Sequence, residues 1–197
     1  MDSKDQAANQ PILNIVGQKV ALGPRRHDLL PFYERWINDF EVSGTLAAVG
    51  WRPHTAEDEE RWYASSAAGN AEVYFTIYER STSRPIGITD LRTIDHQHRT
   101  AEFGIMIGEK DCWGKGYGTE TTVLMLDYGF TALGLHNIML RAFSHNERGI
   151  RAYKRAGFQV IGRRREALRR GGRVLDIVFM DCLATEFKSP VLARLLD

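Results

Sequence analysis

The chain has 197 residues, of which 43% are hydrophobic, and its formal net charge at pH 7 is +1. This length and hydrophobic content suit one well-cored domain, and the near balance of charge favours neither nucleic acid nor a membrane as a partner. Two cysteines are too few for a disulfide framework, and no apolar run approaches the roughly 20 residues of a membrane span, so we expect a cytoplasmic protein.

The predicted elements alternate between strands and helices. Residues 1–10 are polar and lack the apolar segment of a signal peptide, and we expect a disordered tail over residues 1–14. Asp28 and Asn146 are candidate N-cap residues, and Gly157 has the position of a helix-ending glycine. In chain order the sequence predicts a strand at 19–22, a helix at 28–38, a helix from Thr55, strands at 73–78, 85–93 and 100–107, a helix at 119–133, a strand at 137–143, a helix at 146–156, and strands at 158–162 and 174–183.

A glycine-rich turn, residues 113–119 (Trp-Gly-Lys-Gly-Tyr-Gly-Thr), joins the strand at 100–107 to the start of a long helix. Unpaired backbone N–H groups and the helix dipole meet at such a point and favour a phosphate or pyrophosphate, and glycines let the backbone approach it closely. The spacing matches neither a P-loop nor GxGxxG, so an ordinary loop remains the alternative from local context. The apolar face of the helix is expected at Thr119, Val123, Leu126, Phe130 and Leu133.

Three segments in this order resemble the GNAT superfamily of acyl-CoA-dependent N-acetyltransferases. The first is the strand at 101–107 with the glycine turn, and the second is residues 135–138 (Leu-His-Asn-Ile). The third is residues 146–158, which contain the spacing Tyr-x-x-x-Gly-Phe from Tyr153 onward. The combination is far more specific than any one segment.

The C-terminal part of the chain is similar to the RimJ/RimL branch of that superfamily and to its spermidine acetyltransferase relatives. The residues that carry this similarity are Arg165, Glu166, Ala167, Gly172, Asp176 and Met180. The resemblance covers residues 15–187, which we expect to form a single domain, with residues 188–197 as a C-terminal extension.

The resemblance implies an α/β (α+β) fold in which a central mixed, mostly antiparallel sheet is flanked by helices and its middle strands splay apart. The gap between those strands is implied to admit acetyl-CoA, with the pantetheine arm along the strand and the pyrophosphate at the glycine turn. Trp113 departs from the Gln or Arg that the family usually has there. The residues implied to bind acetyl-CoA are Ile105, Met106, Ile107, Trp113, Gly114, Lys115, Gly116, Tyr117, Gly118, Thr119 and Asn146.

The implied reaction is direct attack of a neutral amine on the thioester. A lysine-like amine has a pKa near ~10.4 and a peptide α-amine near ~8, so a base is useful. Tyr153 matches the family's general acid for the departing thiolate, with a core-packing role as the alternative. Period-two alternation puts Glu102 on the face of Gly104 and Met106, where it is a candidate base or substrate-orienting group, or a structural carboxylate. Backbone N–H groups near Met106 are candidate oxyanion donors.

The acceptor is the least defined part of the prediction. Trp36, Phe40 and Trp51 are expected to frame the acceptor cleft. We expect the acceptor to be the N-terminal amine of a peptide or protein, or a small-molecule amine. A polyamine or antibiotic acetyltransferase and a non-catalytic acyl-CoA-binding module remain the alternatives.

Other candidate sites carry less weight. His96 and His98 lack a third ligand, so no metal is expected, and Cys112 is interpreted as a packing residue. The arginine cluster between Arg163 and Arg173 is interpreted as a solvated face, with an acidic substrate or the 3′-phosphate of coenzyme A as alternatives. A homodimer is left open.

Overall fold

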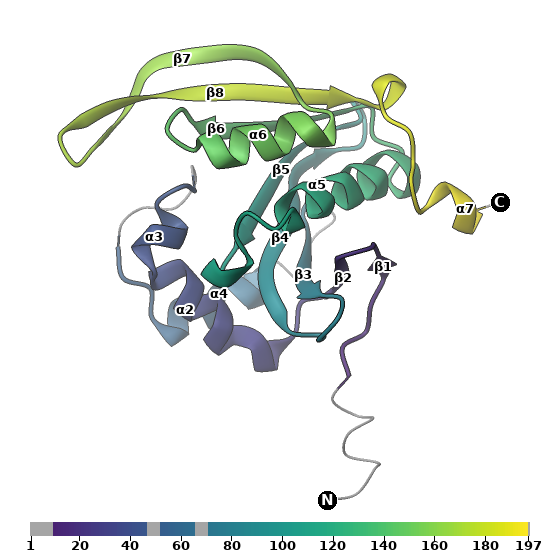
Figure 1. The fold of residues 1–197 in the computed structure, drawn as a ribbon, viewed down its shortest axis with the longest axis horizontal. Coiled ribbons are helices and arrows are strands. Elements are labelled where there is room, and N and C mark those ends of the chain that lie inside the picture. Colours follow the sequence, from purple (N-terminus) through teal and green to yellow (C-terminus); the bar gives the residue numbers. More distant parts are fainter. Residues whose placement is uncertain (1–9, 47–51, 66–70, 197) are drawn as a thin grey trace, which may run out of the picture.

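The computed structural model describes residues 10–46, 52–65 and 71–196. These residues form one eight-stranded sheet in the order β1-β2-β3-β4-β5-β6-β8-β7 (Figure 1). Every neighbouring pair is antiparallel except β5 and β6, which are parallel. The strands are β1 (Ile15–Val16), β2 (Val20–Pro24), β3 (Val73–Glu79), β4 (Pro85–Asp95), β5 (Thr100–Ile107), β6 (Asn137–Phe143), β7 (Gln159–Arg170) and β8 (Arg173–Leu183). The expected mixed, mostly antiparallel sheet flanked by helices is confirmed.

Helices cover both faces of the sheet, and each layer has its own core. The helices are α2 (Leu30–Asn38), α3 (Phe40–Ser43), α4 (Ala56–Ser65), α5 (Tyr117–Asp127), α6 (Glu147–Ala156) and α7 (Ala193–Leu196). Buried residues of α5 pack with those of the central strands in the larger core, and those of α2 pack with Tyr78, Ile88 and Met106 in a second core. Among the described residues, no helix is long and apolar enough to cross a membrane.

The start of the first long helix differs from the prediction. A 3-10 turn, His27–Leu29, precedes α2, and the side chain of Asp28 does not cap the helix. Instead, Arg26 donates to the Asp28 carboxylate from Nε at 2.9 Å and from Nη2 at 2.7 Å. The nearby guanidinium is a stronger partner for a carboxylate than a backbone N–H group, which explains the loss of the cap.

Helix α5 starts at Tyr117, and its C-terminal end widens into a π-helix, Tyr128–Ala132, closed by Leu133 N donating to Tyr128 O. Thr121, Leu124 and Met125 are buried, whereas Val123 and Phe130 of the expected apolar face are only half-buried. The helix is enclosed on several sides, by the sheet, by α6 and by the C-terminal segment, so no single stripe of residues forms its buried face.

The C-terminal segment is held by a buried carboxylate at the end of α5. Asp127 is fully buried, and its Oδ2 accepts the backbone N–H groups of Val191 and Leu192, each at 3.0 Å. Its Oδ1 accepts the hydroxyl of Thr131 at 2.9 Å. Residues from the expected C-terminal extension are therefore packed onto the larger core.

The arginine-rich segment forms the two long strands β7 and β8, which extend as a ribbon past the other strands (Figure 1). Gly171 and Gly172 make its tip, with φ of 55° and 75°. Arg163 pairs with Asp176 across the ribbon at 3.0 Å. Arg170 reaches back, donating to the carbonyl of Gly44 just after α3, with its guanidinium 5.2 Å from the centre of the Phe143 ring. The ribbon is therefore tied to the helices on the α3 side.

The parallel pairing of β5 with β6 stops partway along β5. The register runs Thr100 with Asn137, Ala101 with Ile138 and Glu102 with Met139, and goes no further. From Phe103 to Ile107, β5 keeps its pairing with β4 on the other side. Backbone groups of this stretch that face β6 therefore have no strand partner, and the sheet is split at its centre.

Candidate functional site

Two cavities meet at the split between β5 and β6. One, which we call the glycine-turn cavity, has a volume of about 240 Å³ and lies between the residue 113–119 turn and α6. The other, the aromatic cavity, has a volume of about 320 Å³ and is enclosed by α2, α4 and the central strands. The residues common to both linings are Thr45, Ile105, Met106, Asn146 and Tyr153. A molecule in either cavity can therefore reach the same point in the split.

The glycine turn provides an open, backbone-lined cradle at the start of α5. Gly116 is the N-cap residue in the left-handed region, with φ of 88°, and Gly114 has φ of 77°. Side chains rarely tolerate this conformation, which explains glycine at both positions. No side chain from the described part of the chain caps the helix, so its first N–H groups remain available to a ligand. Gly114, Gly116, Gly118 and Thr119 all line the cavity, and their binding of a diphosphate stays a prediction.

Trp113 and Arg148 close one side of the glycine-turn cavity. The indole Nε1 of Trp113 donates to the carbonyl of Ile107 at 2.9 Å, and the Arg148 guanidinium lies 3.7 Å from the centre of its ring. Burial lowers the pKa of Arg148. Arg151 and Arg155 line the same cavity, so cationic side chains of α6 face the turn. This charge suits an anionic phosphate ligand.

Asn146 has the cap role that the sequence predicted. Its side-chain Oδ1 accepts the N–H of Gly149 at 3.0 Å at the start of α6. Because Asn146 also lines both cavities, its amide lies where a ligand crosses the split.

Tyr153 lies at the junction of the two cavities. Its ring packs edge-on against Phe103 and near Phe158, each with centroids 6.2 Å apart. Burial raises the pKa of its phenol to about 12, and the positive charge of Arg148 acts in the opposite direction. Within the described residues no hydrogen bond uses its hydroxyl. Tyr153 is thus held by ring contacts and keeps its O–H group free for a ligand.

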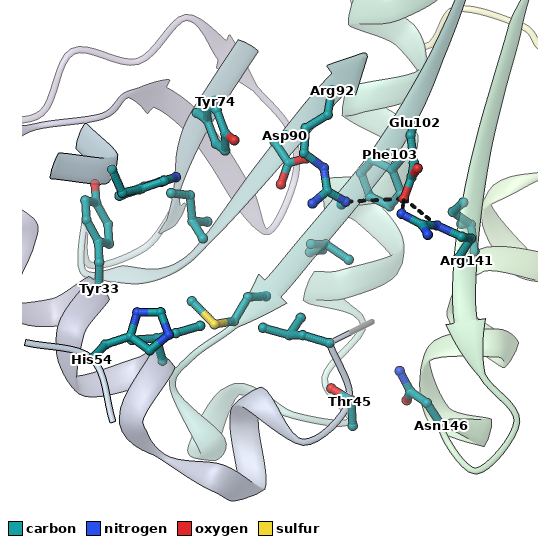
Figure 2. Close-up of a pocket in the computed structure, with 18 of the residues that line it drawn as sticks. Tyr33, Thr45, His54, Tyr74, Asp90, Arg92, Glu102, Phe103, Arg141 and Asn146 are labelled. Carbon is teal, nitrogen blue, oxygen red and sulfur yellow. Dashed lines mark hydrogen bonds and ion pairs between the residues drawn. The ribbon is translucent and has the colours of Figure 1, made fainter. Parts of the chain in front are cut away.

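Aromatic and acidic side chains line the other cavity (Figure 2). Trp62 meets Tyr33 and Tyr74 edge-on, with ring centroids 5.9 Å and 5.4 Å apart. His54 lies 3.2 Å from the buried carboxylate of Glu59, the pKa of which is raised by burial. The lining thus combines aromatic rings with several acidic and basic side chains, which suits a small polar organic molecule.

Glu102 faces the aromatic cavity, but its carboxylate is already engaged by two arginines (Figure 2). Its Oε1 accepts from Arg141 Nε at 3.0 Å and from Nη2 at 2.9 Å, and Arg92 Nη2 lies 3.5 Å away. An acceptor ammonium approaching Glu102 would therefore meet two guanidinium groups.

Asp90, a residue that the sequence analysis did not single out, faces the same cavity (Figure 2). It pairs with Gly104 across β4 and β5, and a Cβ at Gly104 would lie 2.6 Å from Asp90 Oδ1. Burial raises the pKa of the Asp90 carboxyl to about 6, against the lowering effect of Arg92. Its own strand gave no signal that singled it out, because β4 also contains Arg92 and Asp95.

Of the predicted acceptor-framing aromatics, Trp36 and Phe40 do not line the cavities. Trp36 is 2% exposed and is not among the described residues that line either cavity. The indole ring of Trp36 packs against Gly108, and a Cβ added to that glycine would lie 2.1 Å from Trp36 Cγ. Trp36 Nε1 donates to Glu109 Oε1 at 2.9 Å. The structure therefore gives it a packing role. Phe40 is exposed at the first residue of α3 and lines neither cavity, and Trp51 lies outside the described residues.

Two further residues of the predicted cofactor set can be placed. Lys115 points away from the glycine-turn cavity, and its carbonyl accepts from Lys19 Nζ at 3.0 Å. Tyr117 lines that cavity, and its hydroxyl donates to Glu79 at 2.6 Å. Among the described residues there is no cluster of three metal-ligating side chains.

Two cavities that meet at a split in the sheet, with a glycine turn on one side, are the arrangement expected of an acyl-CoA-dependent acyltransferase. Comparison with known proteins gives the family. Residues 22–159 match the acetyltransferase (GNAT) domain. The chain belongs to the GNAT acetyltransferases, and the expectation of acetyl-CoA as acyl donor is confirmed at the level of the family.

The similar proteins include acetyltransferases of small amines. The chain is 33% identical to the spermidine N(1)-acetyltransferase of Vibrio cholerae over 136 residues, which are 68% of this chain and 78% of that one. It is 31% identical to the N-acetyltransferase p20 of Bacillus licheniformis over 113 residues, 57% of this chain and 63%, a little under two thirds, of the relative.

A solved structure of the Vibrio cholerae spermidine N-acetyltransferase in complex with CoA and spermine has a similar fold. Its TM-score is 0.79 at 26% sequence identity, over 86% of this chain and 98% of that one.

Proposed function

We propose that the protein transfers an acetyl group from acetyl-CoA directly to the primary amine of a small cationic molecule, with polyamines as the foremost acceptor class. The observation that carries the proposal is the meeting of the two cavities at Ile105, Met106 and Tyr153. One cavity suits a diphosphate and the other a small organic molecule, so the two substrates approach the same point in one ternary complex.

The acceptor side of the site favours a small molecule over a peptide. A volume of about 320 Å³ is at the lower end of ligand pockets, and its walls are aromatic. The similarity to spermidine acetyltransferases supports the same class. Acylation of a peptide N-terminus or of an antibiotic amine is the second candidate.

Each step of the reaction has a candidate group in the chain. The unpaired backbone of β5 around Met106 offers N–H groups to the negative charge that develops on the thioester oxygen. Tyr153 supplies a proton to the departing thiolate. A non-catalytic acyl-CoA-binding module would need the glycine turn, but it would not need a free hydroxyl at the junction.

The experiment follows thiol release from acetyl-CoA with polyamines, peptides with varied N-termini, aminoglycosides and amino acids, together with calorimetric binding of coenzyme A. Turnover of polyamines supports the proposal, and turnover of peptides alone supports the second candidate. Binding of coenzyme A without turnover of any amine contradicts an acetyltransferase activity on these classes. Membership of the RimJ/RimL branch, a homodimer and a cytoplasmic location stay predictions, and light scattering tests the dimer.

A further inference from the structure

Asp90 is a buried acidic group that the residues around it do not neutralise fully. Its side chain is 13% exposed, and Oδ2 is buried and has no hydrogen bond to any residue that the structure describes. Arg92 Nε lies 2.8 Å from that oxygen, but the contact lacks the geometry of a hydrogen bond. Burying a charge without aligned partners is costly, so such a group in a cavity needs an explanation.

Gly104 makes the room that the Asp90 carboxyl occupies. The two residues are opposite each other in the β4–β5 ladder, and a Cβ at Gly104 would lie 2.6 Å from Oδ1 and 2.8 Å from Oδ2. A real side chain there would displace the carboxyl. The pair therefore places a carboxylate flat against β5, next to the split stretch of the strand.

The position is close to the junction of the cavities. Gly104 directly precedes Ile105 and Met106, which line both cavities, and a strand rises roughly 3.3 Å per residue. An amine in the aromatic cavity can thus contact Asp90, directly or through one water, while its nitrogen faces the split.

We propose that Asp90 binds the ammonium group of the acceptor and accepts its proton before attack. The inference rests on the proposed function and gives it a base. One N–H proton passes to the Asp90 carboxylate, the amine nitrogen then bonds to the acetyl carbon as the C–S bond breaks, and the thiolate takes a proton from Tyr153. The second N–H proton of the attacking amine leaves to solvent or restores Tyr153.

The burial of Asp90 and the charged groups around it determine how readily it accepts a proton from the bound amine. A base works best with a pKa near the working pH, and the pKa of about 6 for Asp90 is far closer to neutral pH than the pKa of an ordinary aspartate. A lysine-like ammonium of pKa ~10.4 gives its proton to such a group with an equilibrium constant of roughly 10⁻⁴ in water. Burial and nearby guanidinium groups lower the pKa of a bound amine and reduce this gap. The titratable and charged groups that face Asp90 or share its cavity are Arg92, Glu102, Glu72, Tyr74, Tyr33, His54, Glu59, Asp58, Arg52, Arg141 and Tyr153.

The choice of Asp90 over Glu102 follows from their partners. Glu102 accepts two hydrogen bonds from Arg141 and has Arg92 beside it, whereas the one ion pair of Asp90 within the described ranges is that with Arg92. The two arginines and two carboxylates together carry no net charge when Asp90 is ionised. A proton on Asp90 therefore gives these four side chains a net positive charge. This charge repels a second cation and favours release of the acylated product.

The test compares Asp90→Asn with Glu102→Gln on two acceptors, 1,4-diaminobutane and 2,2,2-trifluoroethylamine, at pH 7. The first amine is cationic and must lose a proton, and the second is largely neutral. We expect Asp90→Asn to lower kcat/KM for the diamine by roughly 10²-fold and for the fluorinated amine by less than about 5-fold. Glu102→Gln should affect the two amines equally. Asp95→Asn, at the far end of β4, is the matched control and should change neither.

Two further measurements separate a chemical role from a structural one. Calorimetry should show unchanged coenzyme A binding in Asp90→Asn, with at least about 10-fold weaker binding of 1,4-diaminobutane to the coenzyme A complex. The kcat/KM of the wild type should fall as the pH drops through about 6, and this limb should be absent from the variant. If Asp90→Asn does not fold, Gly104→Ala, which displaces the carboxyl, should lower kcat/KM for the diamine by more than about 10-fold.

An equal loss on both amines, or no loss, would overturn the role of Asp90 while leaving the acetyltransferase intact. An inactive wild type that still binds coenzyme A would instead refute the proposed function, and the inference would fall with it.

Discussion

Replacing Tyr153 with Phe removes a single hydroxyl from the junction of the two cavities. The Phe ring can keep the contacts with Phe103 and Phe158, and no hydrogen bond among the described residues is lost. We therefore expect the free energy of unfolding to change by less than about 0.5 kcal/mol, as for a substitution that breaks no buried interaction. The effect should be confined to catalysis.

The size of the catalytic effect follows from the pKa of the phenol. General acids contribute roughly 10²–10⁴-fold, or about 3–5 kcal/mol at about 1.4 kcal/mol per decade. Burial raises the pKa of Tyr153 to about 12, while a thiol is near ~8.5, so proton transfer to the departing thiolate is uphill. This mismatch places the expected loss at the lower end, a roughly 10²-fold drop in kcat.

The assay is thiol release at saturating acetyl-CoA and amine, combined with calorimetry of coenzyme A binding and thermal unfolding. A lower kcat with unchanged coenzyme A affinity and unchanged Tm is the expected result. A variant with the kcat of the wild type would refute the assignment of Tyr153 as proton donor. Equal losses of affinity and stability would show that the hydroxyl is structural.

Three other perturbations test the glycine turn, the C-terminal anchor and the buried carboxyl. Gly116→Ala forces φ of 88° on a residue with a Cβ, so we expect about 1–2 kcal/mol of destabilisation and weaker coenzyme A binding by calorimetry. Asp127→Ala leaves the N–H groups of Val191 and Leu192 without their acceptor and should cost about 3 kcal/mol in urea unfolding, or about 6–12 °C in Tm; an unchanged Tm would contradict the anchor. The Asp90 carboxyl has a folded-state pKa of about 6, above an unfolded value near ~3.9, so its stabilising contribution is present below pH ~4 and is lost as the pH rises through 6. In urea titrations, the free energy of unfolding of Asp90→Asn relative to that of the wild type should therefore rise by about 2 kcal/mol between pH 4 and pH 7. A difference that does not change with pH would refute the raised pKa.

The order of elements could be predicted from the sequence because it depends on local patterns. Alternation along residues 73–78 and 100–107 marks half-buried strands, and the structure has β3 and β5 there. The cap at Asn146 and the left-handed Gly157 after α6 are likewise signals carried by one residue and its neighbours.

Strand β8 was predicted at 174–183, but β7 was predicted only as far as residue 162 and runs to Arg170. Most residues of β7 are exposed, so no buried face imposes a period of two on its sequence. The π-helix at the end of α5 was also not predicted, because the apolar pattern of residues 119–133 reads as one continuous α-helix.

The residues of the site likewise fall into those that local sequence patterns predict and those that depend on contacts distant in sequence. The glycine turn and Tyr153 belong to contiguous motifs and could be located from the sequence. Trp36 looked like a cleft residue because it is aromatic, but its environment is set by Gly108, which is distant in sequence. Asp90 gains its character from Gly104 on the next strand and from burial, and neither can be read from its own segment.

The split between β5 and β6 has a consequence for the order of events in turnover. The glycine-turn cavity and the aromatic cavity have separate walls on α6 and on α2 with α4, and of the residues that the structure describes they share those at the junction alone. Neither substrate needs to pass through the space of the other, so we expect binding in either order and intersecting reciprocal plots of initial rate. Acylated amine and free coenzyme A should each leave by its own side, and each product should compete with the substrate from which it was made.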